Sequence, residues 1–572
     1  MMTKLNGTFT ETDVLVIGGG AGGLQAAISA KRHGGPGTRV TIVDQAMNGR
    51  SGHTAFSNAW MIVATPDDDI DGILSEIVAG NDGIADQLLV REVLEHSYER
   101  LKDFESYGMQ FKREADGSYA RRPTRGLNLA RVMYPEGGGL EFSWKLRGAL
   151  EPLGVNIMDR TFITGLIRDD EGRVTGAVGV HARSGEFQVI SARTTIVCTN
   201  ALTFRSGFVR DITGTGTILS YKAGATLRNA EFSYVRPGTP KFYFEGITFA
   251  IQEGALFKNA HGEPFMKSYE PDWADEADVP RIARAMAFER AKGNDPLYLD
   301  MSPIPEGMRD YFIQSKVRWM DFFFRKLGNE AKTDMFGKTP YYALNQMTKM
   351  GLRTPPDCRS DVPGLLAAGL AQAGCANHFA GFHIGLAVGN GWIAGRSAVE
   401  DLDRLPVPKP DVRLLEDLYA ETMLPLSGDA KAQSDLLLRE LQKVMFAWDI
   451  GILKREDRLD QAMVKVAELE TQMQDLHAPN AHELVRMKET EAMLTAARFI
   501  LGASRMRTES RLSHFREDYD QRDDQNWLDW IDITDTPDGP SFVRTKIPTP
   551  LCPVLPVQRK KREVNNAVVT PG

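Results

Sequence analysis

The alternation of apolar and polar positions defines the first elements of the chain. Residues 13–17 (DVLVI) form a short β-branched run, a glycine cluster follows, and apolar residues then recur every three to four positions to residue 34. That order predicts a strand, a tight turn and a helix. Residues 39–46 (RVTIVDQA) predict a second strand ending in Asp44, and residues 194–200 (TTIVCTN) predict another. Strands that alternate with helices indicate an α/β domain.

The pattern changes twice along the middle of the chain. Residues 154–194 alternate in short runs broken by polar turns, which predicts a small meander of antiparallel strands. From about 241 to 351 the strand pattern is lost and helical stretches appear, at 281–292 and 309–328. We interpret this region as a lid inserted over the first domain. A buried strand then returns at 362–371 (VPGLLAAGLA), followed by a glycine-rich helix.

A proline-rich linker, PVPKP at 406–410, separates the last part of the chain. Beyond it, apolar positions recur at helical spacing over 437–454, 459–476 and 482–504. These stretches predict a C-terminal helical bundle.

Composition narrows the functional class. The net charge is −8 and the basic residues are scattered, so a nucleic-acid surface is not expected, and the basic cluster at 559–562 is interpreted as a solvated tail. The first residues lack the apolar core of a signal peptide, and no apolar run is long enough to span a bilayer. We expect a cytoplasmic protein. Four cysteines lie far apart without metal-ligand spacing, and no metal site is predicted: Cys198, Cys358, Cys375 and Cys552.

The glycine cluster carries the first candidate chemistry. Gly18, Gly20 and Gly23 match G-x-G-x-x-G after a strand and at the start of a helix, where backbone amides can hold a pyrophosphate. Asp44 closes the second strand, where a carboxylate can accept hydrogen bonds from ribose hydroxyls. The motif predicts a dinucleotide cofactor without separating FAD from NAD. The late strand at 362–371 favours FAD, because in flavin folds such a strand rejoins the nucleotide domain.

Further motifs stand in a recognisable order: GGGAGG at 18–23, RSGHTAFSN at 50–58, TGTGTILSYKAGATLRNAEFSYVRP at 213–237 and ESRLSHFREDYDQRDDQNWLDW at 509–530. With these motifs the chain resembles, from Asp13 to about Asp532, the flavoprotein subunits of succinate dehydrogenase and fumarate reductase, and still more that of adenylylsulfate reductase. The resemblance implies an α/β FAD-binding domain, Rossmann-like and three-layered, with an inserted α+β capping domain and a C-terminal helical domain. The boundaries expected are 1–240 and 346–402 for the FAD-binding domain, 241–345 for the capping domain, 403–535 for the helical domain and 536–572 for a tail.

The resemblance also implies the cofactor, FAD, and the residues that contact it. Two of them depart from the family pattern: Thr215 stands where an acid is common, and Leu370 stands where a glutamate often follows the last strand. Each change removes one hydrogen bond, worth about 1 kcal/mol net. The expected cofactor-binding residues are Gly18, Gly20, Ala21, Gly22, Gly23, Asp44, Arg50, Ser51, Gly52, His53, Thr54, Asn58, Thr199, Thr215, Gly369, His383 and Ile384.

His53 leaves three alternatives open. In the membrane-bound dicarboxylate enzymes an SHT run supplies the histidine that is bonded covalently to the flavin, and His53 falls on that position, with Gly52 in place of the serine. Adenylylsulfate reductase holds its flavin without a covalent link. His53 is therefore covalently bonded to FAD, in noncovalent contact with it, or an ordinary loop histidine.

The catalytic candidates also come from the resemblance. Arg284 falls where the dicarboxylate enzymes have the arginine that transfers a proton during hydride transfer at flavin N5. Because arginine is nearly always protonated, anion binding is the alternative role. Arg236 and Met347 stand where two substrate-binding histidines are expected, and His378 stands where an arginine is expected. Loss of these groups argues against succinate and fumarate as substrates.

What remains is a cationic pocket with Arg236, Arg284 and His378, which favours a small anionic substrate. His378 can act as an acid or base near neutral pH, and a structural histidine is the alternative. For His383 we expect a structural role or a flavin contact.

Three functional hypotheses follow. The first is an FAD-dependent oxidoreductase that moves electrons between flavin N5 and a small anion; its specific version is an adenylylsulfate-reductase-like flavoprotein with a ferredoxin-like iron–sulfur partner. The second is an oxidase similar to L-aspartate oxidase, in which oxygen reoxidises the flavin. The third is a flavin-binding scaffold without turnover. An oligomer is compatible with each.

Overall fold

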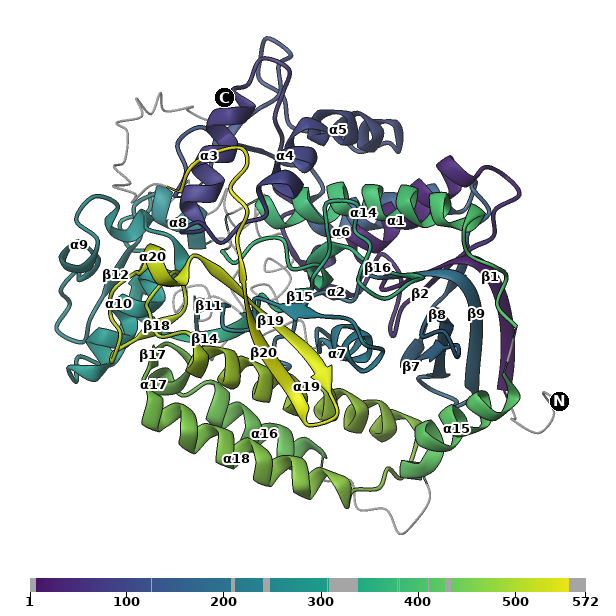
Figure 1. The fold of residues 1–572 in the computed structure, drawn as a ribbon. Coiled ribbons are helices and arrows are strands. Elements are labelled where there is room, and N and C mark those ends of the chain that lie inside the picture. The colour runs from purple at the N-terminus through teal and green to yellow at the C-terminus, as the bar shows by residue number, and fades with distance from the viewer. Residues whose placement is uncertain are drawn as a thin grey trace.

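A seven-stranded sheet forms the centre of the molecule in a computed structural model (Figure 1). Its strands run in the order β6-β2-β1-β9-β8-β7, and β16 also pairs with β9. The structure describes residues 7–124, 126–206, 211–239, 247–305, 307, 338–377, 379, 381–409, 411–426 and 434–554. The strands are β1 (Gly7–Ile17), β2 (Val40–Val43), β6 (Asn156–Met158), β7 (Thr161–Arg168), β8 (Val174–His181), β9 (Phe187–Val197) and β16 (Leu365–Ala367).

The first strand separates two hydrophobic cores. Successive side chains of a strand point to opposite faces of the sheet. Val14 and Val16 accordingly pack in a core with the helices α1 (Ala21–Gly34) and α14 (Phe382–Glu400). Leu15 and Ile17 pack in the other core, with β7, β8 and the C-terminal helices. Helix α14, predicted from the far end of the chain, lies along α1 over the sheet (Figure 1).

The predicted meander is confirmed over β7, β8 and β9, which pair antiparallel. The segment 156–158, assigned to the same meander, instead forms β6 and extends the parallel part beside β2. Three residues are too few to show a period, so the pattern could not assign this strand to a partner. The long strand β9 pairs with β1 along one edge, and with β8 and then β16 along the other. The predicted α/β architecture is therefore present.

Strands are present after residue 241 although the sequence shows no strand pattern there, as the α+β capping domain implied by the resemblance requires. A four-stranded antiparallel sheet, β11-β14-β13-β12, forms this region together with α10, which confirms the helix predicted at 281–292. Strands β12 and β13 have only three or four residues, too short for an alternating pattern to be recognised. The helix predicted at 309–328 lies outside the described residues. The elements are β11 (Ser233–Gly238), α8 (Ile247–Gln252), β12 (Leu256–Lys258), α9 (Met266–Tyr269), α10 (Val279–Ala291), β13 (Leu297–Asp300) and β14 (Lys338–Thr348).

The C-terminal helices pack below the central sheet in the view of Figure 1. The predicted bundle corresponds to α16, α18 and α19, but a hairpin of β19 and β20 follows, and β19 pairs with β10 (Leu227–Arg228). The expected boundary at 535/536 falls inside this hairpin, in which Pro537 and Asp538 connect the two strands and Gly539, with a φ of +101°, begins β20. The elements are α15 (Val412–Met423), α16 (Ser434–Met445), α17 (Trp448–Gly451), β17 (Leu453–Lys454), α18 (Glu456–Gln474), α19 (Ala481–Met506), β18 (Phe515–Arg516), α20 (Asp524–Trp527), β19 (Asp529–Thr536) and β20 (Gly539–Lys546).

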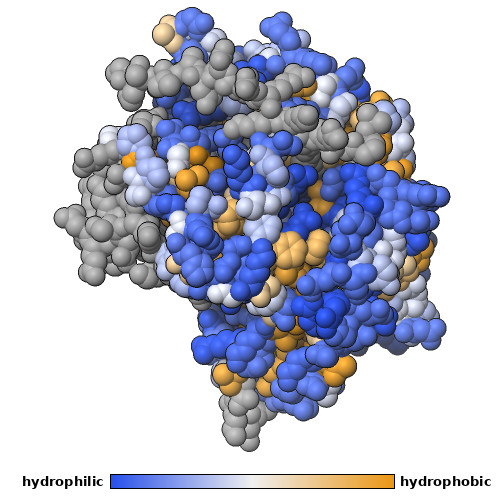
Figure 2. Space-filling view, turned by 90° about the vertical axis from the view of Figure 1, so that its left-hand side faces the viewer, coloured by the Kyte–Doolittle hydropathy of each residue, from blue (hydrophilic) through white to orange (hydrophobic). Residues whose placement is uncertain are grey.

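The remaining elements pack around the central sheet and its helices. Helix α6 packs on α1 and α2, α4 and α5 pack on α14, and β3, β5 and β4 form a small sheet. Hydrophilic residues cover most of the face shown in Figure 2, where hydrophobic residues form separate groups. The elements are α2 (Gly52–Phe56), β3 (Met61–Ile62), α3 (Ile70–Gly80), α4 (Gln87–Glu95), α5 (Ser97–Ser106), β4 (Arg122–Pro123), β5 (Arg131–Met133), α6 (Gly138–Leu150), α7 (Thr215–Lys222), β10 (Leu227–Arg228) and β15 (Gly351–Leu352).

Candidate functional site

The glycine turn between β1 and α1 brings three backbone segments together. Gly18 has a φ of +113°, and a Cβ atom there would lie 2.5 Å from the carbonyl oxygen of Cys198. A Cβ atom on Gly23 would lie 1.8 Å from the carbonyl oxygen of Gly18. Only glycine fits at these two positions. The turn therefore packs directly on the end of β9 and leaves the start of α1 facing an open space.

That space is a cavity of about 300 Å³ at the carboxyl ends of the parallel strands. Its walls come from the start of α1, the loop after β2, the start of β7, the end of β9, the starts of α7 and α14, and part of β11. Of the residues predicted to bind the cofactor, Gly23 and Arg50 are not in the wall: Gly23 packs on Gly18, and the guanidinium of Arg50 lies 5.1 Å from the ring centroid of Trp144. The predicted residues that line the cavity are Gly18, Gly20, Ala21, Gly22, Asp44, Ser51, Gly52, His53, Thr54, Asn58, Thr199, Thr215, Arg236, Gly369, His383 and Ile384.

The helices α1, α7 and α14 are among those that begin at the wall of this cavity. Each has a glycine as its N-cap residue, Gly20, Gly214 and Gly381, and all three glycines line the cavity. A glycine offers no side chain to cap the first amides, and the described first turns of these helices contain no acidic residue. Helix N-termini carry partial positive charge. The cavity is thus suited to a ligand with negative charge.

One polar side chain in the wall has room for a further hydrogen bond. The Thr199 hydroxyl oxygen is buried at the end of β9 and has no hydrogen-bond partner among the residues that the structure describes. Leaving a buried hydroxyl unpaired costs about 1–3 kcal/mol. A ligand in the cavity would remove that cost by bonding to Thr199.

Asp44 holds the loops around the cavity in place. Its carboxylate accepts hydrogen bonds from the backbone N–H of Gly19 (2.9 Å) and Ala46 (2.8 Å) and from the Ser51 hydroxyl (2.9 Å). An ionised carboxylate can accept about four hydrogen bonds. Asp44 therefore fixes the glycine turn and keeps acceptor capacity for a ligand hydroxyl, the role predicted for it.

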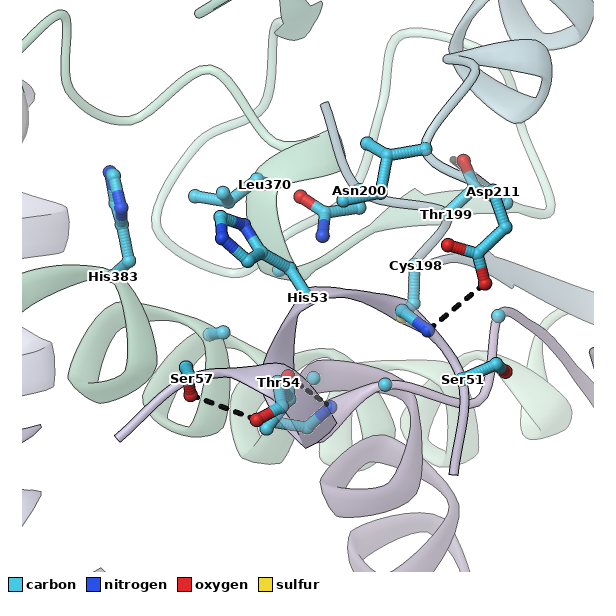
Figure 3. Close-up of a pocket in the computed structure, with 18 of the residues that line it drawn as sticks. Ser51, His53, Thr54, Ser57, Cys198, Thr199, Asn200, Asp211, Leu370 and His383 are labelled. Carbon is cyan, nitrogen blue, oxygen red and sulfur yellow. Dashed lines mark hydrogen bonds between the residues drawn. The ribbon is translucent and has the colours of Figure 1, made fainter. Parts of the chain in front are cut away.

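The loop 51–58 wraps the start of α1. The Ala21 N–H donates to the Thr54 hydroxyl at 3.3 Å, and the Ser57 hydroxyl donates to the Thr54 carbonyl at 2.8 Å. His53 lies on α2 in the same loop. Its ring and that of His383, at the start of α14, point to the same side of the two helices (Figure 3). These two histidines lie at one end of the cavity wall, with Leu370 beside them.

Asp211 lines the cavity without having been predicted. Its carboxylate accepts a hydrogen bond from the Gly52 N–H at 3.0 Å (Figure 3), and its carbonyl accepts one from the Gln45 amide at 2.8 Å. Burial, and then the nearby Asp44 carboxylate, raise the pKa of Asp211. It stands four residues before Thr215, the threonine that replaces the acid of the family pattern. The presence of an acid close to the altered motif was the only signal in the sequence.

Lys349 is a second residue that the sequence pattern did not indicate. It follows β14, is buried, and its Nζ atom lies 2.8 Å from Nε2 of His383. Burial lowers the pKa of Lys349 well below its usual value, and burial lowers the pKa of His383 in the same way. This contact places a basic pair directly behind one wall of the cavity.

Of the two predicted catalytic residues that the structure describes, Arg236 lines the cavity and Arg284 does not. Arg236 lies on β11, is buried and lines the cavity. Arg284 lies on α10, outside the residues that form the cavity wall, and its guanidinium is 5.1 Å from the ring centroid of Phe515. Burial, followed by Arg281, lowers the pKa of Arg284, whereas Asp278 and Glu270 raise it. His378 lies outside the described residues. The roles assigned to Arg284 and His378 stay predictions.

The C-terminal motif at 509–530 forms a buried network of charges. The Arg507 guanidinium donates to Glu231 at 2.9 Å and to Glu509 at 2.8 Å, and Arg511 donates to Glu509 at 2.6 Å. The side chains of all four residues are 0% exposed. Glu231 lies between β10 and β11. These ion pairs therefore connect the C-terminal region to the segment that leads into β11. Its role in the described structure is architectural.

Two other kinds of feature are absent from the residues that the structure describes. Within the described ranges, no group of three or more His, Cys, Asp and Glu side chains is arranged to hold a metal ion. Across that same part of the chain, no helix has the length and apolar character needed to cross a bilayer.

Comparison with known proteins agrees with the geometry. Residues 13–383 match the FAD binding domain family, and residues 438–560 match the fumarate reductase flavoprotein C-terminal family. The chain is 29% identical over 539 residues to a fumarate reductase (CoM/CoB) subunit of Methanothermobacter marburgensis, covering 89% of this chain and 94% of that protein. A variant of E. coli quinol fumarate reductase FrdA has a TM-score of 0.85 at 20% identity, covering 96% of this chain and 98% of the other. Adenylylsulfate reductase of Archaeoglobus fulgidus has a TM-score of 0.79 at 21% identity, covering 95% and 96%.

The fold, the cavity and the matched residues define an FAD-dependent oxidoreductase. Within that class, the chain belongs to the family of fumarate reductase and succinate dehydrogenase flavoproteins. Its cofactor is FAD.

Proposed function

We propose that the cavity at the start of α1 holds FAD, with the pyrophosphate at the first amides of α1 and the flavin ring between His53 and His383. Three helix N-termini without side-chain caps and the unpaired Thr199 hydroxyl support this placement. When bound, FAD supplies the electron-transfer chemistry. The residues of the chain bind it, orient it and set the charge around it.

The substrate we propose is a small anion other than succinate or fumarate. The observation that carries this proposal is the buried Arg236 side chain in the wall of the cavity. An arginine supplies a planar fork of donors that matches a carboxylate, sulfate or phosphate group. Met347, at another position where the dicarboxylate enzymes have a substrate-binding histidine, is buried and apolar. Among the described residues of the wall, Arg236 supplies a cation, and a histidine of the dicarboxylate clamp is replaced by Met347.

Replacing Arg236 with methionine is expected to weaken binding of the anionic substrate. A charge-assisted hydrogen bond is worth about 1.5–3 kcal/mol, so the expected loss is roughly 10-fold to 150-fold in Kd. Arg236→Lys, which keeps the charge but not the fork, is the matched control and should lose less. The measurement is a titration of the holoprotein with candidate anions, followed by the change in the flavin spectrum. Equal affinities in the wild type and Arg236→Met would contradict the assignment.

The role of His53 is tested by acid precipitation of the purified yellow protein. Colour in the supernatant means that FAD is held noncovalently, and colour in the pellet means a covalent bond. If the colour stays in the pellet and moves to the supernatant in His53→Ala, His53 carries the bond. A colourless protein after expression with ample riboflavin would contradict the placement of FAD in this cavity.

We further propose that a separate iron–sulfur protein exchanges electrons with the flavin, as in the adenylylsulfate-reductase-like version of the hypothesis. The chain has only four cysteines, far apart in the sequence. The test compares reoxidation of the reduced holoprotein by air and by an added ferredoxin-like protein. Fast recovery in air alone would instead support an oxidase like L-aspartate oxidase. Absence of turnover with every electron acceptor and anion would support the scaffold hypothesis.

A further inference from the structure

A buried lysine and a buried histidine meet directly behind the cavity wall. Nζ of Lys349 lies 2.8 Å from Nε2 of His383. His383 lines the main cavity, and it also lines a much smaller space that Lys349 borders on the other side. Leu370 also borders both spaces. Because Nζ of Lys349 contacts the imidazole of His383, a change of charge on Lys349 is passed to the main cavity through that ring. The other residues around the small space are Thr348, Leu370, Gln372, Cys375 and Leu386.

Two cations cannot coexist at this distance in a buried site. At 2.8 Å, two positive charges repel each other strongly because the surrounding dielectric constant is low. Burial already lowers the pKa of both groups, and each charged ring or ammonium group would lower that of the other. The pair therefore carries at most one positive charge, that is, one proton beyond the neutral amine and imidazole. Whether that extra proton is bound depends on the charge nearby.

The groups that act on the pair come from three other elements. The Cys375 thiol, after β16, faces Lys349, and burial raises the pKa of that thiol, so it stays neutral. The imidazole of His53, on α2, faces His383 and lowers its pKa further. The Tyr234 ring, on β11, has its centroid 5.8 Å from Nζ of Lys349. The Asp86 carboxylate raises the pKa of the Cys375 thiol further. Extra negative charge in the cavity would raise the affinity of the pair for a proton.

We propose that Lys349 and His383 share one exchangeable proton, which they take up from solvent to balance the negative charge that enters the cavity on reduction. This inference rests on the proposed placement of the flavin ring beside His383. An external two-electron donor is oxidised, the FAD proposed to occupy the cavity would accept both electrons, and one solvent proton binds between Nζ and Nε2. The N–H bond to that proton is the bond that forms on these two side chains, and none of their heavy-atom bonds breaks. Lys349 is a positioning residue, since it acts through His383.

A second buried lysine offers a matched control. Lys454 on β17 is also buried, and its Nζ atom donates to the carbonyl oxygens of Gly451 (3.0 Å) and Ser513 (3.5 Å). Burial lowers the pKa of Lys454 to about 7. It is not among the residues that line the cavity. Removing its charge tests the effect of a lost buried lysine without touching the pair.

The experiment counts protons during anaerobic reduction of the holoprotein with dithionite in weakly buffered solution near neutral pH. The slope of the midpoint potential against pH gives the same count independently. We expect Lys349→Met to take up one proton fewer per two electrons than the wild type. Lys349→Arg, whose guanidinium stays protonated throughout, should also take up one proton fewer, and Lys454→Met should equal the wild type. An unchanged count and slope in Lys349→Met with FAD bound would overturn the inference.

A second variant covers the case in which Lys349→Met does not fold. His383→Gln removes the ring that shares the proton and is expected to lose the same proton. We also expect the equilibrium constant for reduction at neutral pH to fall at least about tenfold in either variant, which is about 30 mV for a two-electron couple. A wild-type count and potential in His383→Gln would equally overturn the inference. The proposed placement of FAD is tested separately, by Gly23→Ala in the α1 glycine turn. Unchanged FAD binding in that variant would contradict the placement of FAD, whereas an unchanged proton count in Lys349→Met with FAD bound would contradict only the inference about the pair.

Discussion

Replacing Arg507 with methionine is expected to lower the free energy of unfolding by about 3–5 kcal/mol. The guanidinium of Arg507 is fully buried between Glu231 and Glu509, and it also donates to the backbone carbonyls of Trp527 and Asp529. The substitution removes all of these ion pairs and hydrogen bonds at once. Two carboxylates would then remain in the interior with less of their positive charge, and an unpaired buried charge is far more costly than the pair.

The matched control lies two residues earlier. The side chain of Arg505 pairs with Glu456 and Asp460 on α18, but it is 46% exposed. An exposed ion pair contributes only about 0–1 kcal/mol, so Arg505→Met should differ little from the wild type. Both variants are compared by urea unfolding followed by tryptophan fluorescence. If Arg507→Met unfolds within about 1 kcal/mol of Arg505→Met, the network does not hold the C-terminal region as described.

Gly23→Ala is expected to weaken FAD binding by about 10-fold to 100-fold. The new Cβ atom would lie 1.8 Å from the carbonyl oxygen of Gly18, so α1 must move away from the glycine turn. Overpacking of this kind costs about 1–3 kcal/mol. The cost falls on the first turn of α1, whose amides are proposed to hold the pyrophosphate, so it should appear in cofactor affinity.

Gly37→Ala is the control for this substitution. A Cβ atom on Gly37 would meet no described heavy atom within 4 Å, and the residue lies in the turn that follows α1. The measurement is the Kd for FAD of the apoprotein, by quenching of flavin fluorescence. Unchanged affinity in Gly23→Ala, with the fold intact by circular dichroism, would mean that the start of α1 does not contact the cofactor.

Local patterns in the sequence predicted the elements that position the cofactor. The spacing of Gly18, Gly20 and Gly23, with Asp44 at the end of the next strand, is a compact signal in which each residue type has its own geometric reason. The antiparallel meander and α14 were predicted because their apolar periods are regular over many residues. These elements supply part of the wall of the cavity.

The site residues and strands that the sequence did not indicate depend on contacts between distant segments. Lys349 and His383 lie 34 positions apart, and their meeting depends on how the chain returns from β14 to the central sheet. Asp211 reaches the cavity because its carboxylate binds the Gly52 N–H, a contact across 159 positions. Strands β12 and β13, in the sheet β11-β14-β13-β12, carry too few residues to show a period. They form because tertiary pairing stabilises them.

The most direct test of the proposed substrate class is anaerobic mixing of the reduced holoprotein with fumarate, followed by the recovery of the oxidised flavin spectrum. We predict no recovery on the timescale of turnover, because Arg236 and Met347 stand where a dicarboxylate clamp would need histidines, whereas an anion that fits a single arginine fork restores the spectrum. Rapid and stoichiometric reoxidation by fumarate, unaffected by Arg236→Met, would contradict it.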